Sequence, residues 1–297
     1  DLIAFLGRVC ALDQAAVVCD LIFGLPHQTE ESWLDDLNIC TGLGLDGVDL
    51  YCLTMLPSSP LTAAVRNGSI PRGADVAEQG SLYVHGAQRL VQAGWRHLTT
   101  AHFASGTRER NLYNQLIKSG ANCLAYGAGA AGNTSGFSYR VISELTRYRQ
   151  LVDERQKPLG GIYGTGAGHD AKGMVTGGIE TGRLDLSVVD QSVPGFAKAV
   201  RPLAGQWEEA GLVRLGSDPS RSVIRLTLAG RFWHTNLTSA LHQMIDALLR
   251  TEPARPVAPK PSASLTAMKP THTTDSEKQH LLTALREKLA SNPDGVL

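Results

Sequence analysis

Residues 15–26 read AAVVCDLIFGLP, and this stretch decides the fold class. From Ala15 to Phe23 the run is apolar apart from Asp20, which is the pattern of a strand buried on both faces of a parallel sheet. A glycine and a proline at positions 24 and 26 end the run. We therefore predict a buried parallel strand over 15–23 that leads into a tight turn.

We expect one helix before this strand in the sequence and one after it. Residues 2–12 have a helical pattern, and a second helix begins after Thr29, a favourable N-cap residue. Two glutamates follow Thr29 in the first turn, where carboxylates suit the helix dipole. The apolar stripe of this second helix consists of Trp33, Leu34, Leu37 and Cys40.

The alternation of strands and helices continues further along the chain. We expect a strand over 47–53, a long helix over 74–93 and a strand over 97–101. Their short connections predict an α/β fold with a parallel sheet. The units are too few for a closed barrel, so either the sheet is open or further strands lie upstream of Asp1.

The second half of the chain changes character. Over 187–249, two helical stretches, two short strands and a final helix resemble a winged-helix module. This stretch has no basic stripe, so a packing role is favoured over DNA binding. Residues 251–276 are rich in proline and alanine and read as a linker, and 277–297 turn helical again, as expected at the start of a further domain.

The overall composition excludes some classes of partner. The chain has 297 residues, with 42% hydrophobic and 19% charged residues and a formal net charge of zero. A neutral chain gives no electrostatic reason to bind nucleic acid or anionic membranes. No apolar run reaches membrane-spanning length, so we expect a cytoplasmic protein without a membrane partner.

The cysteines predict no metal site. They stand at positions 10, 19, 40, 52 and 123, and no two have CxxC spacing. Their apolar neighbours favour buried, reduced thiols.

Asp20 is the anomaly in the first strand, because a buried carboxylate without a partner is costly. It lies near the predicted C-terminal end of the strand, where α/β folds bind ligands. Asp20 is therefore a candidate ligand contact, with a structural cap of a backbone amide as the alternative.

Residues 20–29, DLIFGLPHQT, resemble the DLIYGLPxQT segment of radical S-adenosylmethionine (SAM) proteins of the oxygen-independent coproporphyrinogen III oxidase (HemN-like) group. The resemblance continues through 45–57, 101–104 and the glycine-rich 125–130, and covers about residues 1–250. It implies the C-terminal part of a partial TIM-like radical SAM (β/α) barrel over 1–140. A connecting segment over 141–186 and a small winged-helix-like C-terminal domain over 187–250 then follow.

The same resemblance implies two cofactors and an electron donor. SAM would contact Asp20, Thr54 and Ala131. A [4Fe–4S] cluster would be held by a CxxxCxxC motif that this sequence lacks, so its ligands are expected upstream of residue 1 and the segment alone is expected to be inactive. The electron donor would be a flavodoxin-like or ferredoxin-like protein.

Residues 107–114, TRERNLYN, resemble the heme-utilisation (HutW/ChuW) type of this group, which opens the heme ring anaerobically with methyl transfer. This implies heme or a related tetrapyrrole as substrate. Arg108 and Arg110 could hold propionates in a bidentate manner, with a solvated polar loop as the alternative. His102 is a candidate heme ligand or proton donor, or else a core residue.

Residues 278–297 resemble the opening of a cytosolic heme carrier of the HutX/ChuX type, which predicts a fused carrier domain. Three other functions stay open. They are coproporphyrinogen III oxidation, heme binding as in the heme-chaperone (HemW-like) members of the group, and a non-catalytic scaffold.

Overall fold

The computed structural model describes residues 2–134, 136–216 and 222–251. These residues form two compact units: unit 1 contains residues up to 120 and 168–251, and unit 2 contains 121–167. Unit 1 has two hydrophobic cores, one in each of its two chain segments. The predicted linker beyond residue 251 and the predicted domain start at 277–297 lie outside the described residues.

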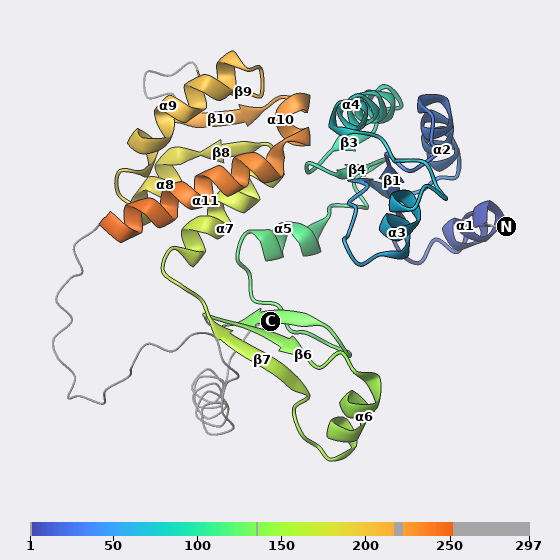
Figure 1. Cartoon of the computed structure of the whole chain (residues 1–297), viewed down its shortest axis with the longest axis horizontal. Helices are drawn as coiled ribbons and strands as arrows, with labels where there is room; N and C mark the ends of the chain where they lie inside the picture. Colours follow the sequence, from blue (N-terminus) through green and yellow to red (C-terminus); the bar gives the residue numbers. More distant parts are fainter. Residues whose placement is uncertain (1, 135, 217–221, 252–297) are drawn as a thin grey trace. The chain divides into compact units, whose positions relative to one another are not determined.

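The first segment of unit 1 contains a four-stranded sheet with the strand order β1-β2-β4-β3 (Figure 1). Its strands are β1 (Val18–Phe23), β2 (Gly47–Cys52), β3 (Arg96–His97) and β4 (His102–Ala104). β1 and β2 pair in parallel, as predicted, but β4 is antiparallel to both β2 and β3. The expectation of an all-parallel sheet is therefore wrong beyond β2.

The strand predicted over 97–101 is also wrong. His97 ends β3, and residues 98–101 reverse the chain between β3 and β4. The backbone N–H of Leu98 donates to the carbonyl of His102 at 2.9 Å. The N–H of His102 donates to Oγ1 of Thr99 at 3.2 Å. A threonine hydroxyl thus stabilises the reversal, although β-branched residues favour strands.

Helices α2 and α4 pack on one face of this sheet. Thr29 and Ser32 form a reciprocal capping box at the start of α2, which confirms the predicted N-cap. The indole Nε1 of Trp33 on α2 donates to the carbonyl of Leu82 on α4 at 2.9 Å. The helices of this segment are α1 (Leu2–Ala11), α2 (Glu30–Gly42), α3 (Pro60–Arg66), α4 (Val76–Gln92) and α5 (Leu112–Lys118).

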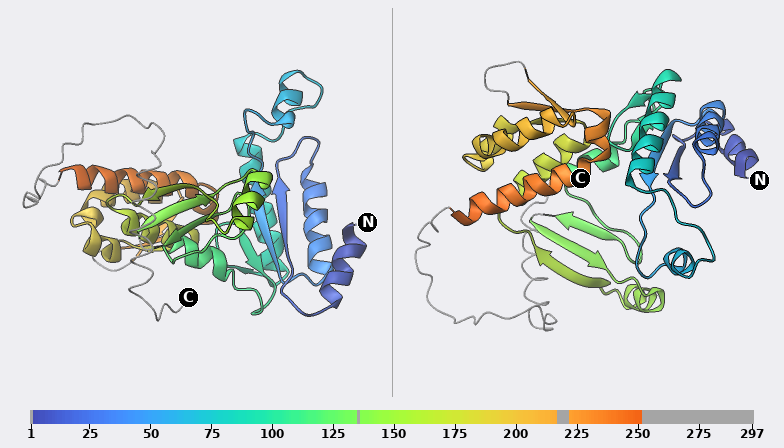
Figure 2. Two further views of the ribbon diagram at one scale, coloured as in Figure 1. Left: turned by 90° about the horizontal axis from the view of Figure 1, so that it is seen from below. Right: turned by 45° about the horizontal axis from the view of Figure 1, so that its top comes forward.

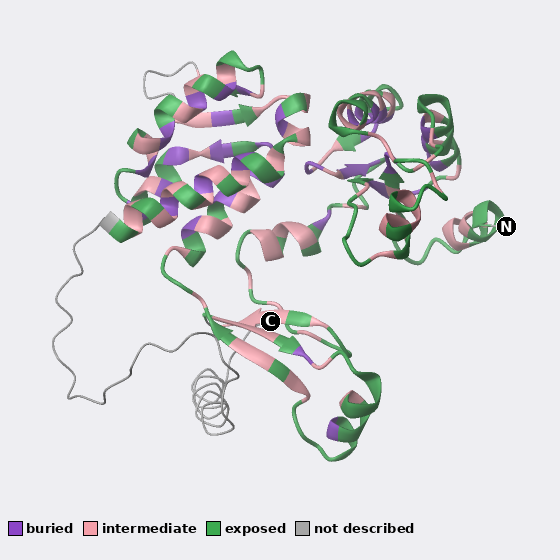
Figure 3. Cartoon of the chain, viewed as in Figure 1, coloured by how far each residue is buried: buried purple, intermediate pink, exposed green. Residues whose placement is uncertain are grey.

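β1 is less buried than its sequence predicts. Phe23 is buried, but Val18 is 38% exposed and Ile22 is 46% exposed. Figure 3 shows exposed as well as buried residues in this segment. The reason is its position, because β1 is an edge strand of the described sheet and the helices cover one of its faces. The prediction of a strand buried on both faces is therefore wrong for the described residues.

The second segment of unit 1 is the C-terminal module. Its antiparallel sheet has the order β8-β10-β9, and helix α11 runs along α7 (Figure 2). The core includes Ala171 and Ile179 on α7, so it begins upstream of the predicted start at residue 187. The elements are α7 (His169–Glu180), β8 (Arg183–Asp185), α8 (Leu186–Ser192), α9 (Phe196–Glu209), β9 (Val213–Leu215), β10 (Val223–Leu226), α10 (Leu228–Phe232) and α11 (His234–Thr251).

Unit 2 is a small antiparallel sheet with one helix. Its elements are β5 (Ala131–Thr134), β6 (Phe137–Val141), α6 (Leu145–Asp153) and β7 (Leu159–Gly164), with the strand order β5-β6-β7. Among the described residues of this unit, Val141 and Leu151 alone are buried. Its core is correspondingly small.

Candidate functional site

Three ionisable residues form a row across one face of the sheet in unit 1. The strand register pairs Asp20 with Asp49, and Asp49 with His102. Their strands place Val48 and Phe103 in the core beneath α2 and α4. Because side chains alternate along a strand, Asp49 and His102 point to the opposite face.

His102 is enclosed rather than open to a ligand. Its side chain is 2% exposed, and Nδ1 lies 2.9 Å from Oδ2 of Asp49. Nε2 lies 3.4 Å from Oε1 of Glu109 but makes no hydrogen bond to a described residue. Gly47 admits this pair, since a Cβ there would lie 3.1 Å from both His102 and Glu109. This is the environment of a core histidine, and the substrate role stays a prediction.

The three predicted SAM contacts lie in different surroundings. Asp20 is exposed in the middle of β1, and partial burial and the charge of Asp49 raise its pKa. No described residue hydrogen-bonds its carboxylate, which leaves the oxygens available to accept hydrogen bonds from a ligand. Thr54 is exposed two residues beyond β2, and Ala131 is exposed at the start of β5 in unit 2.

A cavity of about 350 Å³ opens beside Asp49. Burial and the charges of Asp49 and Asp20 raise the pKa of Tyr51 to about 12, so its phenol is a hydrogen-bond donor at neutral pH. The C-terminal module completes the wall. The polar and aromatic lining includes Asp49, Tyr51, Tyr83, Asn111, Asn114, Lys118, Glu180, Arg231, Phe232, Trp233 and His234.

The acids of this cavity have partners within the protein. Oε1 of Glu180 lies 2.8 Å from Nζ of Lys118, and Oε2 accepts a hydrogen bond from Oγ1 of Thr100 at 2.7 Å. Asp49 is in hydrogen-bond contact with His102. Arg231 differs, because Nη1 is buried without a described hydrogen-bond partner.

Comparison with known proteins fixes the family. The chain is 42% identical over 250 residues to anaerobilin synthase of Escherichia coli O157:H7, a match that covers 83% of this chain and 54% of that protein. It is 28% identical over 251 residues to oxygen-independent coproporphyrinogen III oxidase of Salmonella typhimurium, covering 78% of this chain and 52% of the relative. The chain is a HemN-like radical SAM protein. This confirms the resemblance seen in residues 20–29 and 107–114.

The fold comparison agrees with this assignment. The structure of coproporphyrinogen III oxidase (HemN) from Escherichia coli, described there as a radical SAM enzyme, matches with a TM-score of 0.64 at 21% identity. The match covers 81% of this chain and 58% of that one, and it confirms the predicted fold class. No protein-family model matches the sequence. The chain spans about half the length of the curated relatives, 54% and 52%.

The described residues of this HemN-like chain do not fit an iron–sulfur cluster. No group of three or more His, Cys, Asp or Glu side chains among them could hold a metal ion. Cys40 is buried and burial raises its pKa to about 11, whereas Cys52 is exposed and the other three are partly buried. The prediction of uniformly buried thiols is therefore wrong, because β2 is exposed at its C-terminal end.

The loop of the TRERNLYN motif makes contacts within the chain, and the substrate role of Arg108 and Arg110 stays a prediction. Arg108 forms ion pairs with Asp13 and, at 3.9 Å, with Asp46, and these contacts raise its pKa. Arg110 is exposed. The residues of this motif that line the cavity are Asn111 and Asn114, which share a hydrogen bond of 2.8 Å.

These asparagines belong to the motif, but nothing in its pattern distinguishes them as cavity residues. Asn111 has a left-handed backbone with φ of 53° and precedes α5. Asparagine tolerates this conformation better than most residues, so Asn111 can turn the chain and face the cavity.

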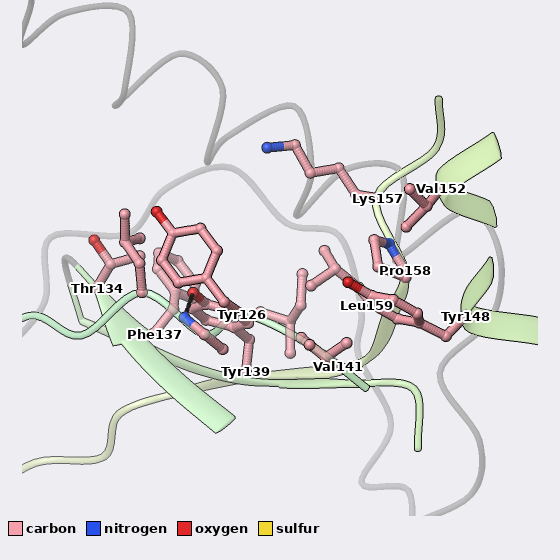
Figure 4. Close-up of a pocket in the computed structure, with 14 residues that line it drawn as sticks. Tyr126, Thr134, Phe137, Tyr139, Val141, Tyr148, Val152, Lys157, Pro158 and Leu159 are labelled. Atoms are coloured by element: carbon pink, nitrogen blue, oxygen red, sulfur yellow. Dashed lines mark hydrogen bonds between the residues drawn. The ribbon is translucent and has the colours of Figure 1, made fainter. Parts of the chain in front are cut away.

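Unit 2 contains a second cavity, of about 340 Å³ and mostly apolar (Figure 4). Its walls carry Tyr126, Phe137, Tyr139 and Tyr148, with Lys157 at one side. The N–H of Ala125 donates to the hydroxyl of Tyr139 at 2.8 Å, which fixes the glycine-rich segment against β6. No helix among the described residues is long and apolar enough to span a membrane.

Proposed function

We propose that this chain is part of a radical SAM enzyme that opens the heme ring with methyl transfer. The observation that carries the proposal is its 42% identity over 250 residues to anaerobilin synthase, against 28% over 251 residues to coproporphyrinogen III oxidase. The chain's family is already established by these similarities, and the substrate is the part that we propose.

The site chemistry supports a large ligand with both aromatic and acidic parts. The cavity of unit 1 combines aromatic walls with hydrogen-bond donors, among them Tyr51, Asn111 and Arg231. Ligand sites typically measure roughly 300–1,000 Å³, so a cavity of about 350 Å³ takes one edge of a tetrapyrrole rather than all of it.

SAM belongs to the same proposal, with Asp20 and Thr54 in unit 1 as its contacts, and the contact at Ala131 in unit 2 stays a separate prediction from the sequence. When bound, it supplies the radical and the methyl group of the family's chemistry. The carboxylate of Asp20 is suited to this role because no described partner occupies it. The cluster ligands are proposed to lie in the part of the relatives' length that this chain does not cover, and a flavodoxin-like or ferredoxin-like protein would supply electrons.

Product analysis tests the proposal. The protein expressed from its complete coding sequence is incubated without oxygen with heme, SAM and a reductant, and the products are identified by mass spectrometry and absorbance. We expect the heme absorbance to disappear and a methylated linear tetrapyrrole to form, and neither change should occur when SAM is omitted.

Two other results would each contradict this function. The similarity to HemN keeps coproporphyrinogen III oxidation as the second candidate, and it predicts decarboxylated product from coproporphyrinogen III with heme left intact. Recovery of unchanged, tightly bound heme would instead identify a heme-binding chaperone.

A further inference from the structure

We propose that Arg231 binds a carboxylate of the substrate in the cavity of unit 1. The C-terminal module, rather than the loop at 107–110, would then hold the acidic edge of the ligand. The identity of that ligand as a tetrapyrrole rests on the proposed function. The carboxylate site itself rests on the contacts of Arg231.

Arg231 is a half-buried cation with no described ion-pair partner, and its Nη1 is buried. It stands near the end of α10 and lines the cavity. Nη1 has no hydrogen-bond partner among the described residues, and Nη2 has one long contact, of 3.4 Å, to the carbonyl of Thr181. Partial burial of a charge without a partner is costly to the folded protein, and a bound anion would reduce that cost.

The surroundings of Arg231 are shaped for the guanidinium but do not neutralise it. Gly182, with φ of 79°, leaves the space, since a Cβ there would overlap the guanidinium. Tyr83 lies nearby, with its hydroxyl donating to the carbonyl of Thr100 at 2.6 Å. Burial and the charge of Arg231 lower the pKa of His97 to about 3, so His97 is uncharged at neutral pH.

The other charged groups of the cavity already have partners. Glu180 pairs with Lys118 at 2.8 Å, and Asp49 with His102 at 2.9 Å. Among the described charged residues that line the cavity, Arg231 is therefore the one available for an external anion. A guanidinium binds a carboxylate through two parallel hydrogen bonds, which selects this anion by geometry as well as by charge.

The neighbours of Arg231 indicate the remainder of the ligand. Phe232 and Trp233 follow it directly and also line the cavity, with their rings 5.4 Å apart. Aromatic side chains pack favourably against a planar ring. Carboxylate arms on a flat aromatic ring system, as in a tetrapyrrole with propionates, match both features. By contrast, Arg108 is already paired with Asp13.

A pair of probes separates the carboxylate from the ring. Mesoporphyrin IX and its dimethyl ester share the macrocycle, but the ester has no carboxylate. We expect Arg231→Gln in the 297-residue chain to weaken binding of the acid at least about tenfold in a fluorescence titration, the range for losing a charged hydrogen bond. Binding of the ester should change little, and Arg231→Lys should keep part of the affinity for the acid.

Arg225→Gln is the matched control, because Arg225 is an exposed residue of β10 in the same module and does not line the cavity. It should bind both probes as the unsubstituted chain does. The inference is overturned if Arg231→Gln binds the acid normally, if it loses both probes equally, or if the unsubstituted chain binds neither.

Failure of this inference and of the proposed function can be told apart. If the complete protein opens heme while Arg231→Gln binds the acid normally, the carboxylate site is wrong and the function stands. If Arg231 selects the acid but the complete protein leaves heme intact, the site stands and the reaction is wrong.

Discussion

Asp20 and Asp49 are neighbours on the adjacent parallel strands β1 and β2 but differ in what surrounds them. Asp49 is 6% exposed and is held by His102, whereas Asp20 is exposed and has no described hydrogen-bond partner. The carboxylate of Asp49 therefore fixes the local structure, whereas that of Asp20 can accept hydrogen bonds from a ligand. This difference makes Asp20 the residue to test for cofactor binding.

Asp20→Asn in the complete protein should weaken SAM binding by about 1–3 kcal/mol, the range for losing a charged hydrogen-bond partner. Isothermal titration calorimetry measures the affinity. Asp35→Asn is the control, because Asp35 is exposed on α2. SAM affinity that is equal in the two variants would show that Asp20 is not a SAM contact.

At the residue scale, the sequence indicated part of the site. Asp20 was visible because it interrupts an apolar run. Arg231 was not, because its neighbours at 228–234 read as an ordinary helix and its isolation depends on the cavity. Glu180 was missed for the same reason, since its partners Thr100 and Lys118 are distant in sequence.

Among the helices and strands, the contact between α2 and α4 depends on a glycine, Gly86, which has no side chain. Gly86 lies on α4 against Trp33, and a Cβ at Gly86 would lie 2.8 Å from the indole Nε1. That indole is fully buried and donates to Leu82, so it has little freedom to move. The glycine lets the two helices approach.

Gly86→Ala should therefore lower the free energy of unfolding by about 1–3 kcal/mol, the typical cost of overpacking a core. Alanine is the better helix former by about 1 kcal/mol, so a loss would identify the contact with Trp33 as the cause. Urea denaturation measures the change.

Gly80→Ala on the same helix is the control. A Cβ there would meet Phe232 at an ordinary 3.6 Å, so this variant should be as stable as the unsubstituted chain or more stable. If both variants have the same stability, the packing argument for Gly86 is wrong.

Helix ends are predictable from the sequence where a capping residue or a glycine marks them. The N-cap at Thr29 and the glycine after residue 93 marked the ends of α2 and α4. The reversal at 98–101 was not predictable, because two threonines there read as a strand. Their hydroxyls instead bind the backbone of His102 and the carboxylate of Glu180, the latter 80 residues away.

For the whole molecule, the fold class followed from the sequence, whereas the division into units did not. Residues 121–167 form a separate unit with a small core, although the glycine-rich part of that segment resembles the family barrel. The chain covers 54% of anaerobilin synthase, so its reaction has to be measured on the complete protein.

Measuring methyl transfer from SAM to a heme-derived product tests the proposed function most directly. The complete protein is incubated anaerobically with heme, a reductant and SAM that carries a deuterated methyl group, and the products are examined by mass spectrometry. We expect a linear tetrapyrrole that retains the deuterated methyl group, with iron released from the ring. Intact heme, or a ring-opened product without the label, would contradict it.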